Sequence, residues 1–374
     1  MRLGLTPGGM ARSTGRSTVM EETLLVDADV HLSIPDRELI PYLEEPHRSR
    51  MEHTKHTSPD DGWDRSVNGK IPMDTQDGEY EGVKSAERLY ESVCEDLYVD
   101  YPIINTFAAM SRNPEPEWSM ALMRAHNDLL LDRYLDEYDE FRGLVTLSTQ
   151  RPEEAAEELD RVGDEGSMVG VYVHNTGAHP PLGDPAYDVL WRAVEDHDFP
   201  VVFHGSANGF MYEFPRQNQA LNSFLPVHTL AHAWSQMLTV ASLISEGTPE
   251  KFPGLDFVFL EAGVTWFPYM MWRLNKEYAM RRSEVPMLQK SPEEYMREQF
   301  YVGSQPIEEP NDPANLDRVV GAIGADRLLF ATDYPHWDFD HPEALDKHLR
   351  STYTEAERDR ILHGNAIDVF DLDL

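Results

Sequence analysis

Eight short runs of apolar and β-branched residues recur along this chain, and stretches with helical periodicity separate most of them. Several of the runs are almost continuously apolar, which is typical of strands buried on both faces of a sheet. The runs span residues 24–31, 101–107, 141–148, 168–175, 199–206, 256–263, 300–306 and 327–335. The clearest helical stretches span residues 152–166, 185–198, 228–247, 266–282 and 313–324.

This alternation of eight strands with helices predicts an α/β fold, a (β/α)8 TIM barrel. An open, doubly wound sheet is the alternative, because it alternates strands and helices in the same way. Such sheets often bind phosphate groups through G-x-G-x-x-G or G-x-x-x-x-G-K-[ST] loops, and neither motif occurs in the sequence. The barrel is therefore the favoured architecture.

Two polar regions accompany the predicted barrel. We expect residues 1–22, rich in Gly, Ser, Thr and Arg, to form a disordered N-terminal extension, and residues 23–374 to form one barrel domain. Residues 32–100, after the first strand, contain a long polar stretch with little apolar periodicity, so we interpret them as an inserted lid. Residues 1–22 lack the apolar core of a signal peptide, and no apolar run approaches the roughly 18 residues of a membrane helix, so we expect a cytoplasmic protein.

The chain is strongly acidic, with 67 Asp and Glu residues against 32 Lys and Arg residues and a formal net charge of -35 at pH 7. This charge repels phosphate backbones and anionic lipids, which argues against nucleic-acid and membrane partners. The acidic residues are dispersed, and only 7 of the basic residues are Lys. High salt screens the repulsion on such a surface, so we predict a halophilic protein, with an acidic mesophilic enzyme as the alternative.

Titratable residues stand at the carboxyl ends of four predicted strands, where barrel enzymes carry their active sites. A single residue of this kind is usually a hydrogen-bonded core residue or a helix N-cap. Burying five such groups together is costly unless a positive charge neutralises them, and a divalent cation does so through His nitrogen and carboxylate oxygen. The five residues are Asp29, His31, His204, Glu261 and Asp333.

These positions also carry a family resemblance. The sequence resembles the amidohydrolase superfamily, in the amidohydrolase-related branch that includes aminocarboxymuconate-semialdehyde decarboxylase. The resemblance covers about residues 24–372, in the same order and with the expected placement of strands. The matching segments are VDADVH, PLGDPAYDVLWRAVEDHDFPVVFHG, FPGLDFVFLEAGVTWFP, LLFATDYPHWD and ILHGNAIDVF.

The resemblance implies one divalent metal ion held by Asp29, His31, His204 and Asp333. Asp29 departs from the His-x-His pair of the family, and Glu261 stands where the decarboxylases carry a catalytic His. Asp333 is the predicted acid/base at the metal, and Glu261 is a second acid/base or a further ligand. We expect the ion to be Zn²⁺. Mn²⁺ and Mg²⁺ are the alternatives, because two carboxylates make a harder donor set than three imidazoles.

Further residues have a predicted role in substrate binding, each with a structural alternative. His174 ends a strand, and Arg216 could pair with a substrate carboxylate or lie on the acidic surface. Trp266 could line the pocket or pack in the core, and His336 could support the site or the fold. The tentative substrate-binding residues are therefore His174, Arg216, Trp266 and His336.

A pair of histidines at i, i+4, His228 and His232, resembles metal-ligand spacing on one helical face. No H-E-x-x-H motif accompanies the pair, so we favour a capping or packing role for at least one of them.

The leading hypothesis is a metal-dependent enzyme, either a decarboxylase or a hydrolase, acting on a small carboxylated or aromatic molecule. The departures at Asp29 and Glu261 motivate the rival hypothesis, a catalytically silent barrel that serves in binding or assembly. The resemblance further implies a homodimer or a larger homo-oligomer.

Overall fold

The structure is a computed structural model, and it describes residues 23–374 apart from positions 33, 35, 54–84, 107–112, 114, 206–223, 309 and 337. The predicted N-terminal extension and the centre of the predicted lid lie outside the described residues.

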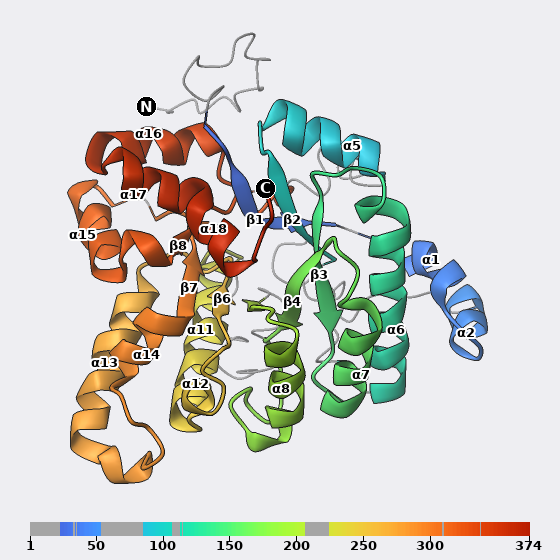
Figure 1. The fold of residues 1–374 in the computed structure, drawn as a ribbon, viewed down its shortest axis with the longest axis horizontal. Helices are drawn as coiled ribbons and strands as arrows, with labels where there is room; N and C mark the ends of the chain where they lie inside the picture. Colours follow the sequence, from blue (N-terminus) through green and yellow to red (C-terminus); the bar gives the residue numbers. More distant parts are fainter. Residues whose placement is uncertain are drawn as a thin grey trace, which may run out of the picture.

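Eight parallel strands form one sheet, in which each strand pairs with the next along the chain (Figure 1). The N–H group of Ala28 donates to the carbonyl of Phe330 at 2.9 Å, and that of His31 donates to the carbonyl of Tyr334 at 2.8 Å, which closes the ring. This confirms the predicted (β/α)8 barrel. The strands are β1 (Val26–His31), β2 (Tyr101–Asn105), β3 (Arg142–Leu147), β4 (Met168–His174), β5 (Val201–His204), β6 (Phe257–Phe259), β7 (Phe300–Gly303) and β8 (Leu328–Leu329).

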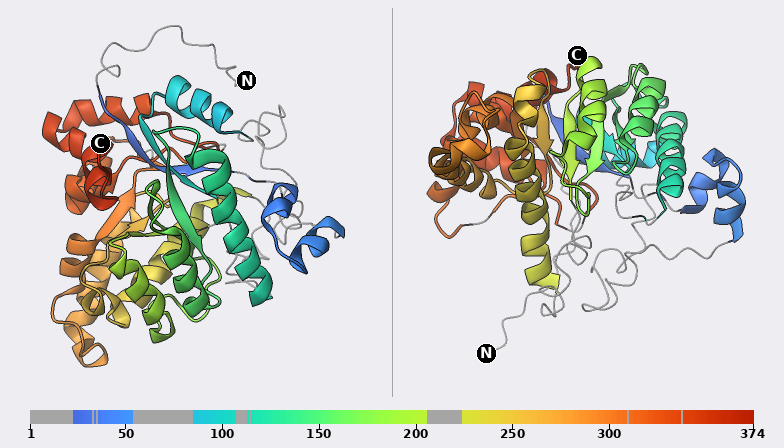
Figure 2. Two further views of the ribbon diagram at one scale, coloured as in Figure 1. Left: turned by 45° about the vertical axis from the view of Figure 1, so that its right-hand side comes forward. Right: turned by 90° about the horizontal axis from the view of Figure 1, so that it is seen from below.

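Helices surround the sheet on its outer side (Figures 1 and 2). They are α1 (Asp36–Leu39), α2 (His47–His53), α5 (Ala86–Tyr90), α6 (Pro116–Leu130), α7 (Pro152–Val162), α8 (Asp188–Asp196), α11 (Phe224–Ser245), α12 (Thr248–Lys251), α13 (Trp266–Arg281), α14 (Pro292–Gln299), α15 (Ala314–Ile323), α16 (Pro342–Thr352), α17 (Glu355–Asp359) and α18 (Asn365–Val369). The 3-10 helices are η2 (Ile40–Tyr42), η7 (Pro185–Tyr187), η8 (Arg282–Glu284) and η9 (Ala325–Arg327), and the π-helical segments are η4 (Glu91–Asp96), η6 (Leu131–Leu135) and η10 (Arg360–Gly364). Among the described residues, no helix combines the length and the apolar character needed to cross a bilayer.

Successive strand residues pack alternately into two apolar clusters, one inside the barrel and one beneath the helices. Val202 of β5 and Val258 of β6 belong to the inner cluster. Phe203 of β5 and Phe257 and Phe259 of β6 belong to the outer cluster. Because side chains alternate along a strand and both clusters are buried, the strands are apolar on both faces. This explains the continuous apolar runs of the sequence.

The first described part of the predicted lid, α1 to α2, lies at the side of the barrel near α6 (Figure 2). The hydroxyl group of Tyr42 donates to Asp132 at 2.5 Å, and Arg133 pairs with Glu38 at 2.8 Å. Both contacts join this segment to η6, the turn that continues α6. A function as a lid stays a prediction.

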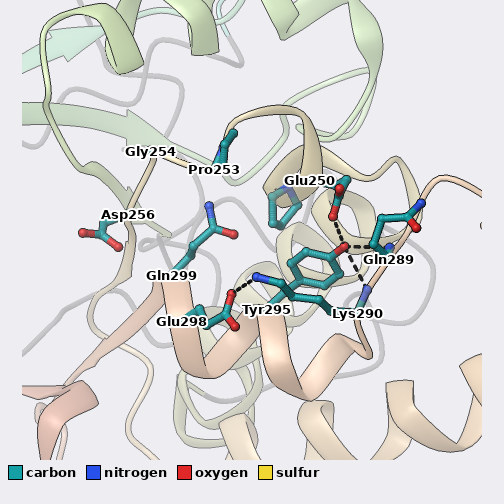
Figure 3. Close-up of a pocket in the computed structure, with 10 residues that line it drawn as sticks. Glu250, Pro253, Gly254, Asp256, Gln289, Lys290, Tyr295, Glu298 and Gln299 are labelled. Carbon is teal, nitrogen blue, oxygen red and sulfur yellow. Dashed lines mark hydrogen bonds and ion pairs between the residues drawn. The ribbon is translucent and has the colours of Figure 1, made fainter.

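A pocket of about 360 Å³ lies at the amino ends of β6 and β7 (Figure 3). Asp256 immediately precedes β6, and Gln299 immediately precedes β7. The hydroxyl group of Tyr295 donates to Glu250 on the pocket wall. The pocket therefore opens on the end of the barrel opposite to the carboxyl ends of the strands, where TIM barrels carry their active sites.

Candidate metal centre

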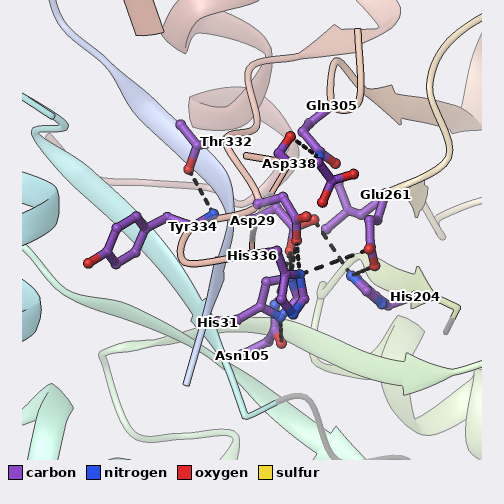
Figure 4. A network of polar contacts seen from close by, with 12 residues as sticks. Asp29, His31, Asn105, His204, Glu261, Gln305, Thr332, Tyr334, His336 and Asp338 are labelled. Atoms are coloured by element: carbon purple, nitrogen blue, oxygen red, sulfur yellow. Dashed lines mark hydrogen bonds and ion pairs between the residues drawn. The ribbon is translucent and has the colours of Figure 1, made fainter. Parts of the chain in front are cut away.

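Four titratable side chains meet at the carboxyl ends of three strands. Asp29 and His31 lie at the end of β1, His204 ends β5, and Asp333 lies four residues after β8. One ligand atom of each lies within 4.8 Å of the others, and every one of the four residues is at most 1% exposed. Figure 4 shows Asp29, His31 and His204 gathered in one cluster. The structure thus brings together the four predicted metal ligands.

An irregularity in β1 directs two of these side chains into the site. The pairing of β1 with β2 shifts register between Asp27 and Val30. Ala28 packs in the inner cluster, whereas Val30 packs in the outer one. A bulge adds a residue to one strand and redirects the side chains after it, so Asp29 and His31 both face the site. The sequence predicts this shared direction from their spacing of two residues.

The interatomic distances show how closely the four groups approach one another. Nε2 of His31 lies 2.7 Å from Oδ1 of Asp333 and 3.1 Å from Oδ1 of Asp29. Nε2 of His204 lies 3.7 Å from Oδ2 of Asp29. The Nε2 atoms of both histidines therefore point into the space between the two carboxylates.

Contacts on the far side of each imidazole ring fix the direction of these Nε2 atoms. Nδ1 of His31 lies 2.9 Å from Oδ1 of Asn105, and Nδ1 of His204 lies 2.7 Å from the carbonyl oxygen of Gly205. A proton on Nδ1 satisfies both oxygens and leaves Nε2 with its electron pair for a metal. The amide group of Asn105 also donates to Oδ1 of Asp29 at 3.1 Å, so one side chain orients two predicted ligands.

A buried carboxylate beneath the centre holds the segment after β8 in place. Oδ1 of Asp27 accepts the N–H groups of Asp29 and Thr332, each at 3.0 Å, and Oδ2 accepts the Thr332 hydroxyl group at 2.5 Å. Burial raises the pKa of Asp27 to about 7. These bonds join β1 to the residue that precedes Asp333.

Glu261 and His336 extend the cluster. Oε2 of Glu261 lies 3.1 Å from Nε2 of His204, and Nδ1 of His336 lies 2.6 Å from Oδ1 of Asp333. Glu261 and Asp333 have φ values of 50° and 64°, in the left-handed region that residues other than Gly rarely adopt. Such conformations concentrate at functional sites, where the surrounding structure maintains them. The two predicted catalytic carboxylates therefore share an unusual backbone geometry.

The pKa shifts show that burial and the neighbouring charges act against each other in this centre. Burial raises the pKa of Glu261 to about 8, and the negative charge of Asp333 adds to the effect. Burial opposes ionisation of Asp29 too, but the His31 and His204 rings hold the pKa of Asp29 below its usual range. The pKa of His31 is correspondingly raised, because Asp29 outweighs the effect of burial. A bound cation would supply the charge that protonated imidazole supplies here.

The donor set fits a divalent metal ion. Oδ2 of Asp29 and Oδ2 of Asp333 are buried, and neither accepts a hydrogen bond from the described part of the chain. Burying carboxylate oxygens in this way is costly without a cation. Two carboxylate oxygens and two imidazole nitrogens are ligands of Zn²⁺ and of Mn²⁺, and two negative charges balance one divalent ion.

The structure places His228 and His232 of α11 beside Glu261 and Asp338, next to the metal centre. Nδ1 of His232 lies 3.2 Å from Oε2 of Glu261, and Nε2 of His228 lies 3.7 Å from Oδ2 of Asp338. Burial lowers the pKa of His232 to about 4, so its ring is neutral at pH 7. The sequence favours capping or packing for at least one of these histidines, whereas both face charged groups.

The tentative substrate-binding residues lie in different surroundings. His174 is buried at the end of β4, in register with His204 on β5. Trp266 is 4% exposed, packs against Phe259 and donates its indole N–H to the Gly263 carbonyl at 2.9 Å. His336 contacts Asp333, as described above. Arg216 lies outside the described residues. Substrate binding by these four residues stays a prediction.

Sequence reasoning missed Asn105, Asp27 and Asp338, which contact members of the cluster. Asn105 ends an apolar strand, the same signal that identifies His204. Asp27 lies in the VDADVH segment and Asp338 in LLFATDYPHWD, so both lie within segments that carry the family resemblance. Their contacts could not be read from spacing, because they cross between distant parts of the chain.

The chain belongs to the amidohydrolase family, whose model matches residues 26–372. It is therefore a metal-dependent hydrolase or carboxy-lyase, as the sequence predicts.

Among curated proteins, the gamma-resorcylate decarboxylase of Polaromonas sp. (strain JS666 / ATCC BAA-500) is 29% identical over 288 residues, which cover 74% of this chain and 82% of that protein. The solved 5-carboxyvanillate decarboxylase from Sphingomonas paucimobilis is 20% identical with a TM-score of 0.72, covering 94% of this chain and 100% of that one. The solved structure of a dihydroxybenzoic acid decarboxylase from Polaromonas sp. JS666 contains bound manganese and the inhibitor 2-nitroresorcinol. It is 19% identical with a TM-score of 0.68, and the match covers 94% of this chain and 98% of that one.

Proposed function

We propose that this chain is a metal-dependent decarboxylase of a small aromatic carboxylate that bears a hydroxyl group. The observation that carries the proposal is the buried centre of Asp29, His31, His204 and Asp333 at the carboxyl ends of the strands. The names of the relatives support it, because they describe decarboxylation of dihydroxybenzoate and carboxyvanillate. The carboxylate and hydroxyl oxygens of such a substrate suit an open position on a divalent ion.

When bound, the ion supplies Lewis-acid polarisation of substrate oxygens. The protein supplies the proton transfer, which we assign to Asp333. The neighbouring His336 and His31 hold the pKa of Asp333 below its usual range against the effect of burial, so Asp333 is a carboxylate at neutral pH. It can therefore accept the proton of the substrate hydroxyl group.

Asp333 then returns that proton to the ring carbon that bears the carboxylate group. A C–H bond forms there, the bond from the ring to the carboxylate carbon breaks, and its electron pair restores the aromatic ring as CO₂ leaves. The product phenolate takes up a proton from water. His336, 2.6 Å from Asp333, keeps the carboxylate oriented through both transfers.

Glu261 is the observation that favours hydrolysis as the second candidate. It replaces the catalytic His that the resemblance assigns to decarboxylases, and its carboxyl group could serve water activation as well as substrate protonation. The two reactions share the same residues and differ in whether water attacks the substrate.

Incubation of metal-loaded protein with 2,6-dihydroxybenzoate, 5-carboxyvanillate, lactones and amides distinguishes the two reactions. We expect CO₂ release, with one deuterium on the ring carbon when the solvent is D₂O. Incorporation of ¹⁸O from labelled water into an acid product, without CO₂, would replace decarboxylation with hydrolysis. Asp333→Asn should lower the turnover of either reaction. Asp326→Asn, at a side chain that is 62% exposed, is its matched control.

For the metal itself, we propose that Mn²⁺ supports the highest turnover, with Zn²⁺ as the alternative that the sequence predicts. The two carboxylates of the donor set suit a harder ion than zinc, and a structural neighbour contains manganese. Reconstitution of metal-free protein with Mn²⁺, Zn²⁺ or Mg²⁺, followed by turnover measurements with each, tests this choice.

We propose that the chain assembles as a homodimer through α11. Leu230, Trp234 and Leu238 are 48%, 42% and 39% exposed and follow one another at i, i+4 spacing along one face. No Asp, Glu, Lys or Arg occurs in α11, although 26% of the chain is charged. An apolar surface of this kind is typical of a covered interface.

We also propose that the protein works in the salt-rich cytoplasm of a halophile. Its dispersed carboxylates repel one another, and molar salt shortens the range of that repulsion to about 3 Å. We expect the melting temperature to rise as KCl increases from 0.1 M to 2 M. A melting temperature that does not change, or cell fractionation that recovers the protein outside the cytoplasm, would contradict this proposal.

A further inference from the structure

A second group of ligand atoms lies beside the proposed metal centre, between α11 and the end of β6. Nitrogen atoms of His228 and His232 and a carboxylate oxygen of Glu261 all lie within 4.8 Å of one another. Donors around an ion at about 2.1 Å lie within roughly 4.2 Å of one another, so small side-chain rotations would complete such a shell. Asp338, 3.7 Å from His228, offers a fourth donor.

His232 is the more buried of the two histidines in this group. It is 6% exposed, and neither of its ring nitrogens has a hydrogen-bond partner within the described part of the chain. Burying polar nitrogens without partners costs free energy that a hydrogen bond or a metal bond would recover. Nδ1 lies 3.2 Å from Oε2 of Glu261, and this oxygen is also buried without a hydrogen bond from the described residues.

The excess of carboxyl groups in the combined cluster also favours a second cation. Four carboxylates surround the combined cluster, and within the described residues no Lys or Arg forms an ion pair with any of them. In their ionised form the four groups carry four negative charges, which two divalent ions would neutralise. The four are Asp29, Asp333, Glu261 and Asp338.

The geometry points to a second divalent-cation site formed by His228, His232 and Glu261, with Asp338 as an additional ligand. Oε2 of Glu261 lies 3.1 Å from Nε2 of His204 in the first centre and 3.2 Å from Nδ1 of His232 in the second. Its carboxylate group therefore bridges two adjacent ions. The inference rests on the first centre of the proposed function, but it does not depend on the reaction performed there.

Equilibrium dialysis of the full chain against Mn²⁺ tests the inference. We expect two ions per chain in the wild type, and one in His228→Ala/His232→Ala. Asp29→Asn/His31→Ala should also retain one ion, held by the second site. His197→Ala/His348→Ala is the matched control, because it removes two histidines outside the cluster whose side chains are 16% and 19% exposed, and it should keep both ions.

Electron paramagnetic resonance of the Mn²⁺-loaded wild type gives a measurement that needs no variant. Two ions bridged by Glu261 should give an exchange-coupled signal, whereas one ion gives an isolated six-line signal. A single ion per chain with an uncoupled signal, unchanged in His228→Ala/His232→Ala, would overturn the second site and leave the proposed function standing. No bound ion at all would overturn both.

Discussion

The side-chain amide oxygen of Asn105 lies 2.9 Å from Nδ1 of His31. It selects the tautomer with a proton on Nδ1 and turns Nε2 toward the predicted metal position. The same amide group donates to Asp29, so β2 controls the direction of two ligands on β1. Contacts of this kind fix ligand orientation before the metal arrives.

Replacement of Asn105 should therefore weaken metal binding without unfolding the barrel. We expect Asn105→Leu to reduce the affinity for Mn²⁺ about 10- to 100-fold, the usual effect of removing a residue that orients a ligand. Competition with a chelator of known affinity measures the change. Asn315→Leu, in the exposed first turn of α15, is the control, and an equal loss there would remove the role of Asn105.

The bonds between Asp27 and Thr332 predict an effect on stability. Thr332→Val removes a buried hydroxyl donor to the Asp27 carboxylate and should lower the free energy of unfolding by about 1–3 kcal/mol. Urea denaturation of metal-free protein measures this change. Thr352→Val, at an exposed residue near the end of α16, should have little effect. Equal stability of the two variants would show that the buried bond contributes nothing.

Asp256 predicts a pH-dependent effect at the other end of the barrel. Burial raises its pKa from 3.8 to about 6, so its charged form is disfavoured in the folded state. The resulting penalty is absent below pH 4, grows as pH rises to 6, and is complete above pH 6. Asp256→Asn should thus stabilise the protein by about 1–3 kcal/mol at pH 8 and by little at pH 4.

Denaturation of Asp256→Asn and wild type at pH 4, 5, 6 and 8 measures this difference. Asp164→Asn, at a side chain 94% exposed, is the control and should follow the wild-type profile. A constant difference across the pH range would rule out titration of Asp256 as the cause.

The apolar face of α11 predicts the oligomeric state. Leu230→Glu/Leu238→Glu places two negative charges in the proposed interface of a chain that already carries a net charge of -35. We expect light scattering to report a shift from a dimer to the 42.8 kDa monomer. Val189→Glu, at a residue of α8 that is 41% exposed, should leave the dimer intact. A wild-type monomer would contradict the proposed interface.

Asp333→Asn tests the proton transfer. The amide group keeps the size of the carboxylate but cannot accept a proton, so turnover should fall by at least about 10²-fold, at the lower end of typical acid/base contributions. Circular dichroism should remain that of the wild type. Unchanged turnover would remove Asp333 from the mechanism.

The fold could be predicted because each strand is apolar on both faces and polar residues mark its ends. The predicted run 199–206 contains β5, and the run 256–263 contains β6. The run 327–335 is regular only over Leu328–Leu329. After it, the N–H of Thr332 bonds to the side chain of Asp27 on β1 instead of to a main-chain carbonyl. No local pattern in the sequence encodes this replacement.

The site could be predicted in part for the same reason. Asp29, His31 and His204 end strands, and the closed barrel brings strand ends together whatever their separation in sequence. The position of His232 depends instead on the angle at which α11 packs over the barrel, so its approach to Glu261 follows from tertiary packing. Helical spacing shows that two histidines share a face but not what that face meets.

Binding of a divalent metal ion by Asp29, His31, His204 and Asp333 underlies the proposed function. Anomalous diffraction from crystals grown with Mn²⁺, recorded on both sides of the manganese absorption edge, locates the ion directly. We expect a peak within about 2.0–2.3 Å of a ligand atom of all four residues. A protein that crystallises with Mn²⁺ and shows no peak between these side chains would contradict it.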